Sequence, residues 1–141
     1  DGAGSARPAP GVLDALDAAA RIVIAPSNPI LSIGPILAVP EVGRAVADRR
    51  DRVVAVSPII AGAALKGPAD RLQAELGHEA SVVGVARLYA PFAAALVMDL
   101  ADRDRAEEVD AAGIRPVLAP TIMSGSNEAA ALARTVVGAG P

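Results

Sequence analysis

The sequence predicts an α/β fold, a parallel sheet with helices on both of its faces. Short apolar runs alternate along the chain with longer amphipathic or charged stretches, which is typical of strands connected by helices. Hydrophobic residues make up 52% of the 141 residues, but aromatic residues make up only 1%. The core therefore consists of small aliphatic side chains, as in parallel sheets that helices cover.

The expected elements are, in order, helix 11–20, strand 21–25, loop 26–35, helix 41–50, strand 53–56, loop 57–68, helix 68–77, helix 81–95, strand 95–99, helix 101–113, strand 114–119 and helix 127–137. Apolar residues at helical spacing after a Pro-Gly pair predict the first helix, and the β-branched run that follows predicts a buried strand. The loop at 26–35 contains three prolines and a glycine, so it should form neither a regular helix nor a central strand. Apolar residues on one face predict helix 41–50, and the run Val-Val-Ala-Val predicts the second buried strand.

Turn and cap residues delimit the second half of the chain. Pro68 starts a helix at a position where its missing N–H costs nothing, and Gly77 ends that helix. Pro91 breaks the next helical stretch, and Gly113 closes the charged helix that follows the third strand. Asn127 is a plausible N-cap for the last helix, with an acidic residue in its first turn. We expect one domain, with 1–10 as a loop or tail and 58–95 as a helical excursion.

Composition excludes several classes of function. The formal net charge is −3, and no basic run extends beyond Arg49-Arg50, so the chain lacks the footprint of a nucleic-acid-polymer binder. Cysteine is absent and His78 is the one histidine, which excludes zinc-thiolate sites, histidine clusters and a Ser-His-Asp triad. Every apolar run is shorter than the roughly 18 residues of a membrane span. We expect a cytoplasmic protein without a membrane partner; its start at Asp1 suggests a piece of something longer.

The loop after the first strand is the first candidate site, because ligands of open α/β sheets bind beyond the carboxyl ends of the strands. Ser27, Asn28 and Ser32 supply small donors and acceptors, and Gly34 permits close approach of a backbone or a ligand. The alternative is that these serines and the asparagine only cap turns.

The loop after the second strand is the other candidate. Gly62 and Gly67 flank Lys66, the sole lysine among 13 basic residues, shortly before a helix start. Free N–H groups there and the ammonium would suit a phosphate. The alternative is a surface lysine before an ordinary helix.

Other polar and aromatic residues fit structural roles better. Asp99 and Asp102 could hold a divalent metal, but helix capping is favoured at their positions. The sequence indicates a solvated loop for His78 and core or interface positions for Tyr89 and Phe92. Arg49, Arg50 and Arg52 are interpreted as a solvated helix end.

Two loop motifs together carry a family resemblance. The stretch IAPSNPILSIGPILAVPEV, with AVSPIIAGAALKGPADR after it, resembles the 2-phospho-L-lactate transferase and phosphoenolpyruvate transferase family of coenzyme F420 biosynthesis. The order of the remaining elements resembles the C-terminal half of this family over essentially the whole chain. The resemblance implies a Rossmann-like three-layer fold, of which this chain is the C-terminal portion.

The resemblance also implies an activity. Family members transfer a phospholactyl or phosphoenolpyruvyl group from a guanosine diphosphate ester to the deazaflavin Fo, release GMP and require Mg²⁺. It places Ser27, Asn28, Ser32 and Gly34 in the nucleotide-ester pocket, with the residues of the second loop near the phosphates. A homodimer is expected, and the magnesium ligands are expected mainly in the N-terminal half, so this chain alone should be inactive.

Two departures from the family pattern affect the second and fourth loops. Ala63 stands where several relatives carry a basic residue, and Pro120 precedes Thr121 where an acid is common. A different class remains open as the alternative function, a non-catalytic nucleotide-sugar-binding regulator of the gluconeogenesis-factor type. Its IGPGS-like loop after a strand is similar, whereas the Ser-Asn-Pro and Lys-Gly-Pro-Ala-Asp stretches favour the transferase.

Overall fold

The structure is a computed structural model, and it describes residues 2–64, 74–77 and 79–140. The helical segments are η1 (Ala3–Ser5), α1 (Val12–Ala18), η2 (Pro29–Ile33), α2 (Gly34–Leu37), α3 (Pro40–Ala47), η3 (Arg50–Arg52), α5 (Val82–Tyr89), η4 (Leu100–Arg105), α6 (Ala106–Ala111) and α7 (Ser126–Gly138). The strands are β1 (Ile22–Ile24), β2 (Val53–Val56), β3 (Ile59–Ile60), β4 (Ala63–Ala64), β5 (Ala95–Met98) and β6 (Arg115–Leu118).

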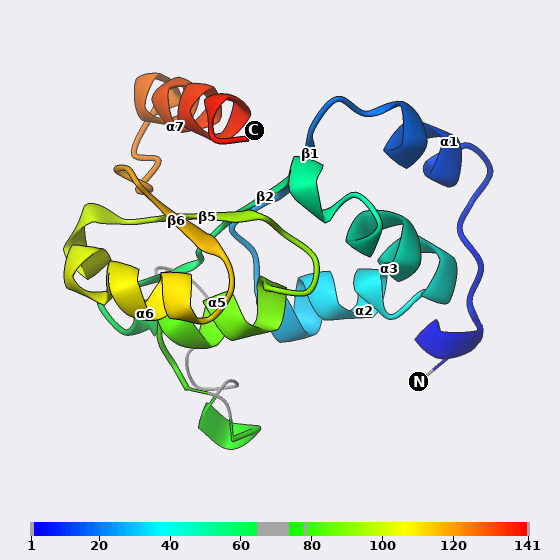
Figure 1. Ribbon diagram of the computed structural model, residues 1–141, viewed down its shortest axis with the longest axis horizontal. Coiled ribbons are helices and arrows are strands. Elements are labelled where there is room, and N and C mark those ends of the chain that lie inside the picture. The colour runs from blue at the N-terminus through cyan, green and yellow to red at the C-terminus, as the bar shows by residue number, and fades with distance from the viewer. Residues whose placement is uncertain (1, 65–73, 78, 141) are drawn as a thin grey trace.

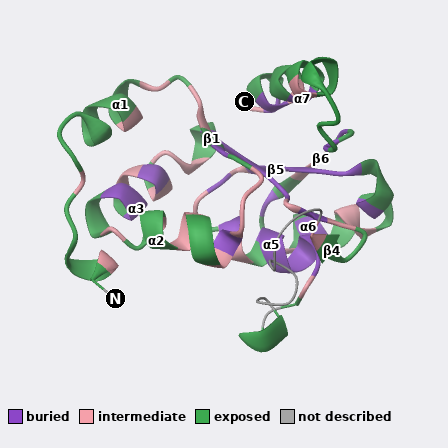
Figure 2. Ribbon diagram, turned by 180° about the vertical axis from the view of Figure 1, so that it is seen from behind, coloured by how far each residue is buried: buried purple, intermediate pink, exposed green. Residues whose placement is uncertain are grey.

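The main sheet has the order β1-β2-β5-β6, and all of its strand pairs are parallel. Helix α7 covers one face of this sheet, while α2, α3, α5 and α6 lie on the other (Figure 1). A Rossmann-like α/β layout with helices on both faces is thereby confirmed. The two central strands, β2 and β5, are buried along their whole length between the helical layers (Figure 2).

The alternation of side chains along each strand divides the core into two clusters. Val53, Ala55, Leu96 and Met98 face the larger cluster with α3, α5 and α6. Val54, Val56, Ala95 and Val97 face the smaller cluster, which Leu132 and Val136 of α7 complete. Neither cluster contains a large aromatic side chain other than Tyr89, which is 1% exposed, with Phe92 packed against the same cluster. The expectation of a small-aliphatic core is confirmed.

The loop predicted over 26–35 is wrong for most of its length. A π-helical turn, η2, starts at Pro29 and continues directly into α2. The prolines do not prevent this, because Pro29 and Pro35 occupy the first turns of their segments, where no intrahelical N–H bond is lost. Sequence reasoning counted the prolines but did not place each one at a helix start.

Three other local features differ from expectation. Only Ile24 of β1 is buried, and Val23 is 48% exposed, because β1 is an edge strand. The hairpin β3–β4 lies within the predicted second loop. The last helix has Gly125 at its N-cap and Asn127 inside the first turn, so the predicted cap is wrong. The predicted helix start at Pro68 lies outside the described residues.

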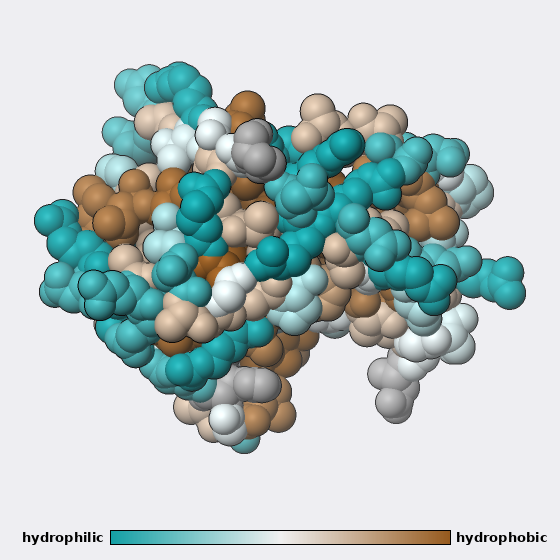
Figure 3. Space-filling view, viewed as in Figure 1, coloured by the Kyte–Doolittle hydropathy of each residue, from teal (hydrophilic) through white to brown (hydrophobic). Residues whose placement is uncertain are grey.

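No single helix among the described residues is long and apolar enough to cross a membrane. The bent pair Pro29–Leu37 and Pro40–Ala47, which meets at 95°, satisfies length and composition alone. On the face shown in Figure 3, hydrophilic residues are interspersed with separate apolar patches.

Candidate functional site at the carboxyl edge of the sheet

The carboxyl ends of the four parallel strands bring four polar loops to one edge of the sheet. Asn28 follows β1, Ser57 follows β2, Asp99 follows β5 and Thr121 lies shortly after β6. In open α/β sheets this edge is where ligands bind. The parallel topology therefore groups loops that are far apart in the sequence.

Asn28 uses one half of its amide to cap η2. Its Oδ1 accepts hydrogen bonds from the N–H groups of Ile30 and Leu31, at 2.9 and 3.0 Å. The other half, Nδ2, is buried and has no hydrogen-bond partner among the described residues. An unpaired buried donor costs about 1 to 3 kcal/mol. The capping interpretation is thus confirmed for the oxygen, and the nitrogen is left unused by the fold.

The neighbours of Asn28 differ in their roles. Ser27 is half-buried, and its hydroxyl bonds to no described residue, whereas Ser32 is exposed on η2. Gly34 donates its N–H to the Pro29 carbonyl, and a Cβ at position 34 would lie 3.0 Å from that oxygen. The close approach expected at Gly34 is therefore that of another part of the backbone.

Gly62 forms the turn of the β3–β4 hairpin. It has φ +77° and follows Ala61 at φ +49°, which is the pair of left-handed conformations of a type I′ hairpin turn. A glycine is needed at this site because of the turn. Lys66 and Gly67, the other predicted residues of this loop, lie outside the described residues.

Asp99 connects the ends of β5 and β6. Its Oδ1 accepts from Ala101 N–H at 3.0 Å, and its Oδ2 accepts from the N–H and the hydroxyl of Thr121 at 2.8 and 3.0 Å. Burial opposes ionisation, but these three hydrogen bonds together hold the pKa of Asp99 below its ordinary value. Asp99 is therefore an ionised structural clamp between the ends of β5 and β6. Its bond from Oδ1 to Ala101 N–H is the helix cap that the sequence predicted.

Asp102 of η4 binds the turn of the hairpin and does not form the helix cap that the sequence favoured at its position, since Asp99 is the N-cap of η4. Asp102 is 6% exposed, and both of its carboxylate oxygens accept from Ala61 N–H, at 3.1 and 3.0 Å. Ser57 stabilises the start of the same hairpin, since its hydroxyl donates to Ile59 C=O and accepts from Ile59 N–H. Sequence reasoning missed Ser57, and only its place after a strand could have indicated it.

These carboxylates do not fit a resident magnesium ion. Both are occupied by N–H donors, and the described residues contain no group of three or more acidic or histidine side chains that could hold a metal. Magnesium is usually bound by carboxylates whose oxygens are free for the ion. We therefore assign no magnesium ligand to the described part of this chain.

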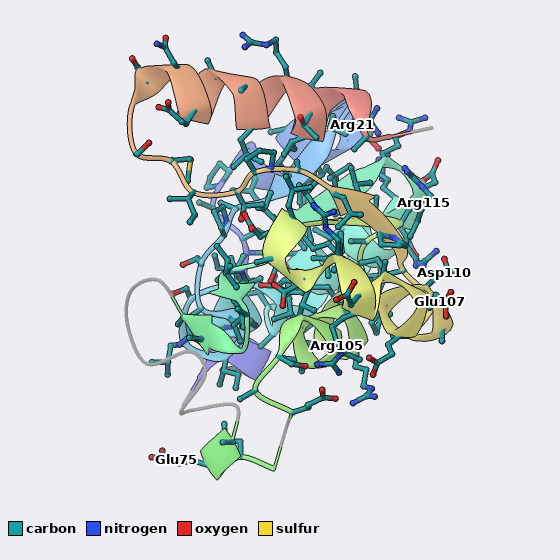
Figure 4. All side chains as sticks on the ribbon, turned by 90° about the vertical axis from the view of Figure 1, so that its left-hand side faces the viewer. Arg21, Glu75, Arg105, Glu107, Asp110 and Arg115 are labelled. Atoms are coloured by element: carbon teal, nitrogen blue, oxygen red, sulfur yellow. The ribbon has the colours of Figure 1, made fainter. Side chains whose placement is uncertain are left out.

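Other residues considered from the sequence are placed away from this edge. Arg50 was expected to be solvated. It instead donates to the Ala90 carbonyl at 2.7 Å and to the Gly113 carbonyl, because its long side chain reaches the segments that follow α5 and α6. Two arginines that the sequence analysis did not single out, Arg87 and Arg105, both pair with Glu79 at 2.7 Å, and Arg105 lies beside α5 (Figure 4). His78 lies outside the described residues.

A groove of about 240 Å³ runs along α7 beside the end of β6. Its lining is Pro120, Asn127, Glu128, Ala131, Leu132 and Thr135. None of the predicted nucleotide-ester residues that the structure describes lies in this groove. It adds an open, mainly apolar surface next to Thr121.

Comparison with known proteins identifies relatives. A family model described as 2-phospho-L-lactate transferase CofD matches residues 2–122. A phosphoenolpyruvate transferase of Streptomyces griseus subsp. griseus is 44% identical over 134 residues, which are 94% of this chain and 42% of that relative. A 2-phospho-L-lactate transferase of Methanothermobacter thermautotrophicus is 38% identical over 132 residues, again 94% of this chain and 42% of the relative. The chain thus spans less than half the length of these curated relatives.

Proposed function

Because the chain belongs to the CofD family of 2-phospho-L-lactate transferases, we propose that it is the nucleotide-ester-binding part of an enzyme of coenzyme F420 biosynthesis. The proposed donor is a guanosine diphosphate ester of lactate or enolpyruvate, and the proposed acceptor is the deazaflavin Fo. Relatives with both printed activities match this chain at similar identity, 38% to 44%, so the proposal includes both donors.

The proposed reaction is a substitution at phosphorus. A ribityl hydroxyl of Fo attacks the phosphorus that bears the lactyl or enolpyruvyl group, the bond to the bridging oxygen breaks, and GMP leaves with that oxygen. The hydroxyl proton passes to solvent or to a base. Catalysis of this type depends mainly on positioning and on neutralising phosphate charge. No step is assigned to a metal ion held by the described residues.

The unpartnered Nδ2 of Asn28 carries the assignment of the pocket. It is a donor at the carboxyl end of β1, and the half-buried Ser27 precedes it in the chain. Donors of this kind suit the oxygens of a diphosphate ester or a guanine carbonyl.

Binding of GDP by the 141-residue chain tests this role of Asn28. Asn28→Asp keeps the oxygen that caps η2 but replaces the donor nitrogen with an acceptor. We expect GDP affinity, measured by isothermal titration calorimetry, to fall about 5- to 150-fold, equivalent to about 1 to 3 kcal/mol. Ser81→Ala removes a cap formed by the same kind of bonds, to Val83 and Gly84 of α5, and shows how much GDP affinity falls when a helix cap alone is lost. Equal GDP affinity in Asn28→Asp and the parent would restrict this residue to capping.

A second titration separates the two classes of function. The parent chain should bind GDP more tightly than UDP-glucose, because the proposed donor is a guanosine ester. Tighter binding of UDP-glucose would favour the nucleotide-sugar-binding regulator.

Turnover is expected only when the rest of a family protein is present. The chain corresponds to 42% of the length of its relatives, and the described residues lack a metal cluster. Formation of product from Fo by this chain alone, at the rate of a complete relative, would contradict the assignment of a binding part.

Lys66 is proposed as the cation on the phosphate side. Lys66→Ala, in a chain completed with the rest of a family protein, should reduce transfer far more than Arg52→Ala. Arg52 is the better control than Arg50, since it is exposed and makes no ion pair with a described residue, whereas Arg50 ties two carbonyls together. Lys66→Arg should restore part of the loss, since the charge is retained. Unchanged kcat and donor KM in Lys66→Ala would remove the second loop from the site.

A further inference from the structure

Helix η4 contacts both ends of the chain that connects β3 to α5. At one end, both carboxylate oxygens of Asp102 accept from Ala61 N–H, at 3.1 and 3.0 Å. At the other end, Arg105 pairs with Glu79 at 2.7 Å. Because η4 directly follows Asp99 at the end of β5, both contacts hold this connection beside the carboxyl edge of the sheet.

The two ends of this connection also lie against each other. A Cβ at Gly62, in the hairpin turn, would lie 4.0 Å from the Ala80 carbonyl oxygen. Lys66 belongs to the chain between these two points. The place where the second loop leaves the described fold is therefore set by the hairpin turn and by the η4 side chain that bonds to it.

The hairpin turn contains a strained residue. Ala61 has φ +49°, and it is the one residue other than glycine with a positive φ in the described part of the chain. Its Cβ makes this left-handed conformation unfavourable. For this reason the first turn position of a type I′ hairpin is normally taken by asparagine, aspartate or glycine. The turn therefore depends on support from outside the hairpin.

Asp102 supplies that support. Its carboxylate accepts the N–H of the strained residue itself, and the side chain bonds to no other described residue. Asp102 is only 6% exposed, and a buried carboxylate costs free energy unless its hydrogen bonds compensate. The N-cap of η4 is Asp99, so capping does not explain Asp102. Strained residues that the surrounding structure holds in place concentrate at functional sites.

We propose that Asp102 is a positioning residue of the donor site: by holding Ala61 in its strained conformation, it fixes the hairpin turn from which the chain continues to Lys66. This inference rests on the proposed function, in which the second loop binds the phosphates of the donor. Both oxygens of Asp102 are committed to Ala61, so its effect on donor binding passes through the turn and not through contact with the substrate.

The GDP affinity of the 141-residue chain, measured by isothermal titration calorimetry, tests this role. Asp102→Ala should weaken GDP binding about tenfold or more, and Asp102→Asn, which keeps one acceptor oxygen, should lose less. Adding Ala61→Gly to Asp102→Ala should restore about threefold or more of the loss, because glycine adopts a positive φ without support. Asp104→Ala, at an exposed site of the same helix, should leave the affinity within about twofold.

A variant on the other face of the sheet controls for a general loss of stability. Val136→Ala shortens a buried side chain of α7, so it should lower the free energy of unfolding while GDP affinity stays within about twofold of the parent. Equal weakening of GDP binding in Val136→Ala and Asp102→Ala would overturn the positioning role.

A double-mutant cycle with Lys66→Ala separates this inference from the proposed function. If Asp102 acts through the second loop, Asp102→Ala should weaken GDP binding by less than about twofold in the Lys66→Ala background. Parental affinity of Asp102→Ala, no recovery from Ala61→Gly, or equal losses in both backgrounds would overturn the positioning role alone. Parental affinity of Lys66→Ala would remove the second loop from the donor site, and it would overturn the proposed role of that loop together with this inference.

Discussion

Loss of the Asp99 clamp should lower the stability of the whole carboxyl edge. In Asp99→Asn an NH₂ group replaces one carboxylate oxygen, so it faces either Ala101 N–H or the two donors of Thr121. At least one donor, the part-buried Ala101 N–H or the buried groups of Thr121, is left without an acceptor whichever way the amide turns. Hydrogen bonds to a charged group contribute about 1.5 to 3 kcal/mol each. We expect the free energy of unfolding to fall by about 2 to 4 kcal/mol.

Urea unfolding followed by circular dichroism measures this loss. Thr121→Val removes only the hydroxyl bond and should cost about 1 kcal/mol, while Asp104→Asn, at an exposed site in η4, should change stability by less than about 0.5 kcal/mol. The folded-state pKa of Asp99 is depressed, so its contribution is present above the ordinary range near pH 4 and disappears as the pH falls further. A loss no larger than that of Asp104→Asn at pH 7 would refute the clamp.

Two further predictions concern the start of α5. A Cβ at Gly84 would lie 1.8 Å from the carbonyl oxygen of Glu79, so Gly84→Ala should lower the free energy of unfolding by about 3 kcal/mol. Gly138→Ala, where nothing lies within 4 Å, should change it by less than about 0.5 kcal/mol in the same urea assay; equal effects would show that the turn before α5 can move freely. Hydrogen bonding to Arg105, with lesser help from Ser81, lowers the pKa of Glu79 to about 2. Its ionised form therefore stabilises the fold fully above pH 4.5 and loses this effect as the pH falls through about 2. Because the side chain is 36% exposed, Glu79→Gln should cost only about 0.5 to 1 kcal/mol at pH 7, a difference that should close near pH 2; a gap of constant size would assign the loss to packing.

The central strands β2 and β5 could be predicted from the sequence because all of their residues are buried. They match the apolar runs at 53–56 and 95–99 within a residue or so, since each run lies between two helical layers. β6 matches the run at 114–119 although none of its residues is fully buried. The edge position of β1 could not be predicted, because a short run of Ile-Val-Ile is the same string whether one side or both are paired. The sequence did not predict η2 and α2, because the prolines of this segment were counted without regard to their positions. A proline prevents a helix only after its first turn, and Pro29 and Pro35 both stand in first turns.

The site was predicted only at the level of which loops take part. Asn28 and Gly62 stand at the expected strand ends, but their backbone roles, a cap and a hairpin turn, depend on a π-helical turn and a hairpin that the residue pattern did not indicate. The bonds from Asp99 to Thr121 and from Asp102 to Ala61 join positions 22 and 41 residues apart. Such pairs are set by the order of strands in the sheet, so no local pattern reveals them.

The distribution of used and unused polar groups limits what the carboxyl edge can bind. Its two buried carboxylates are consumed as acceptors in holding the loops after β2, β5 and β6 in place. The group left over beside β1 among the described residues, the amide nitrogen of Asn28, can donate hydrogen bonds. An edge with a spare donor and committed acceptors suits an oxygen-rich anion better than a cation. The same carboxylates repel that anion at long range, since a low-dielectric protein screens them poorly. A diphosphate ester at this edge therefore needs a compensating positive charge, and Lys66, beyond the hairpin that Asp102 anchors, is the lysine that the sequence offers for it.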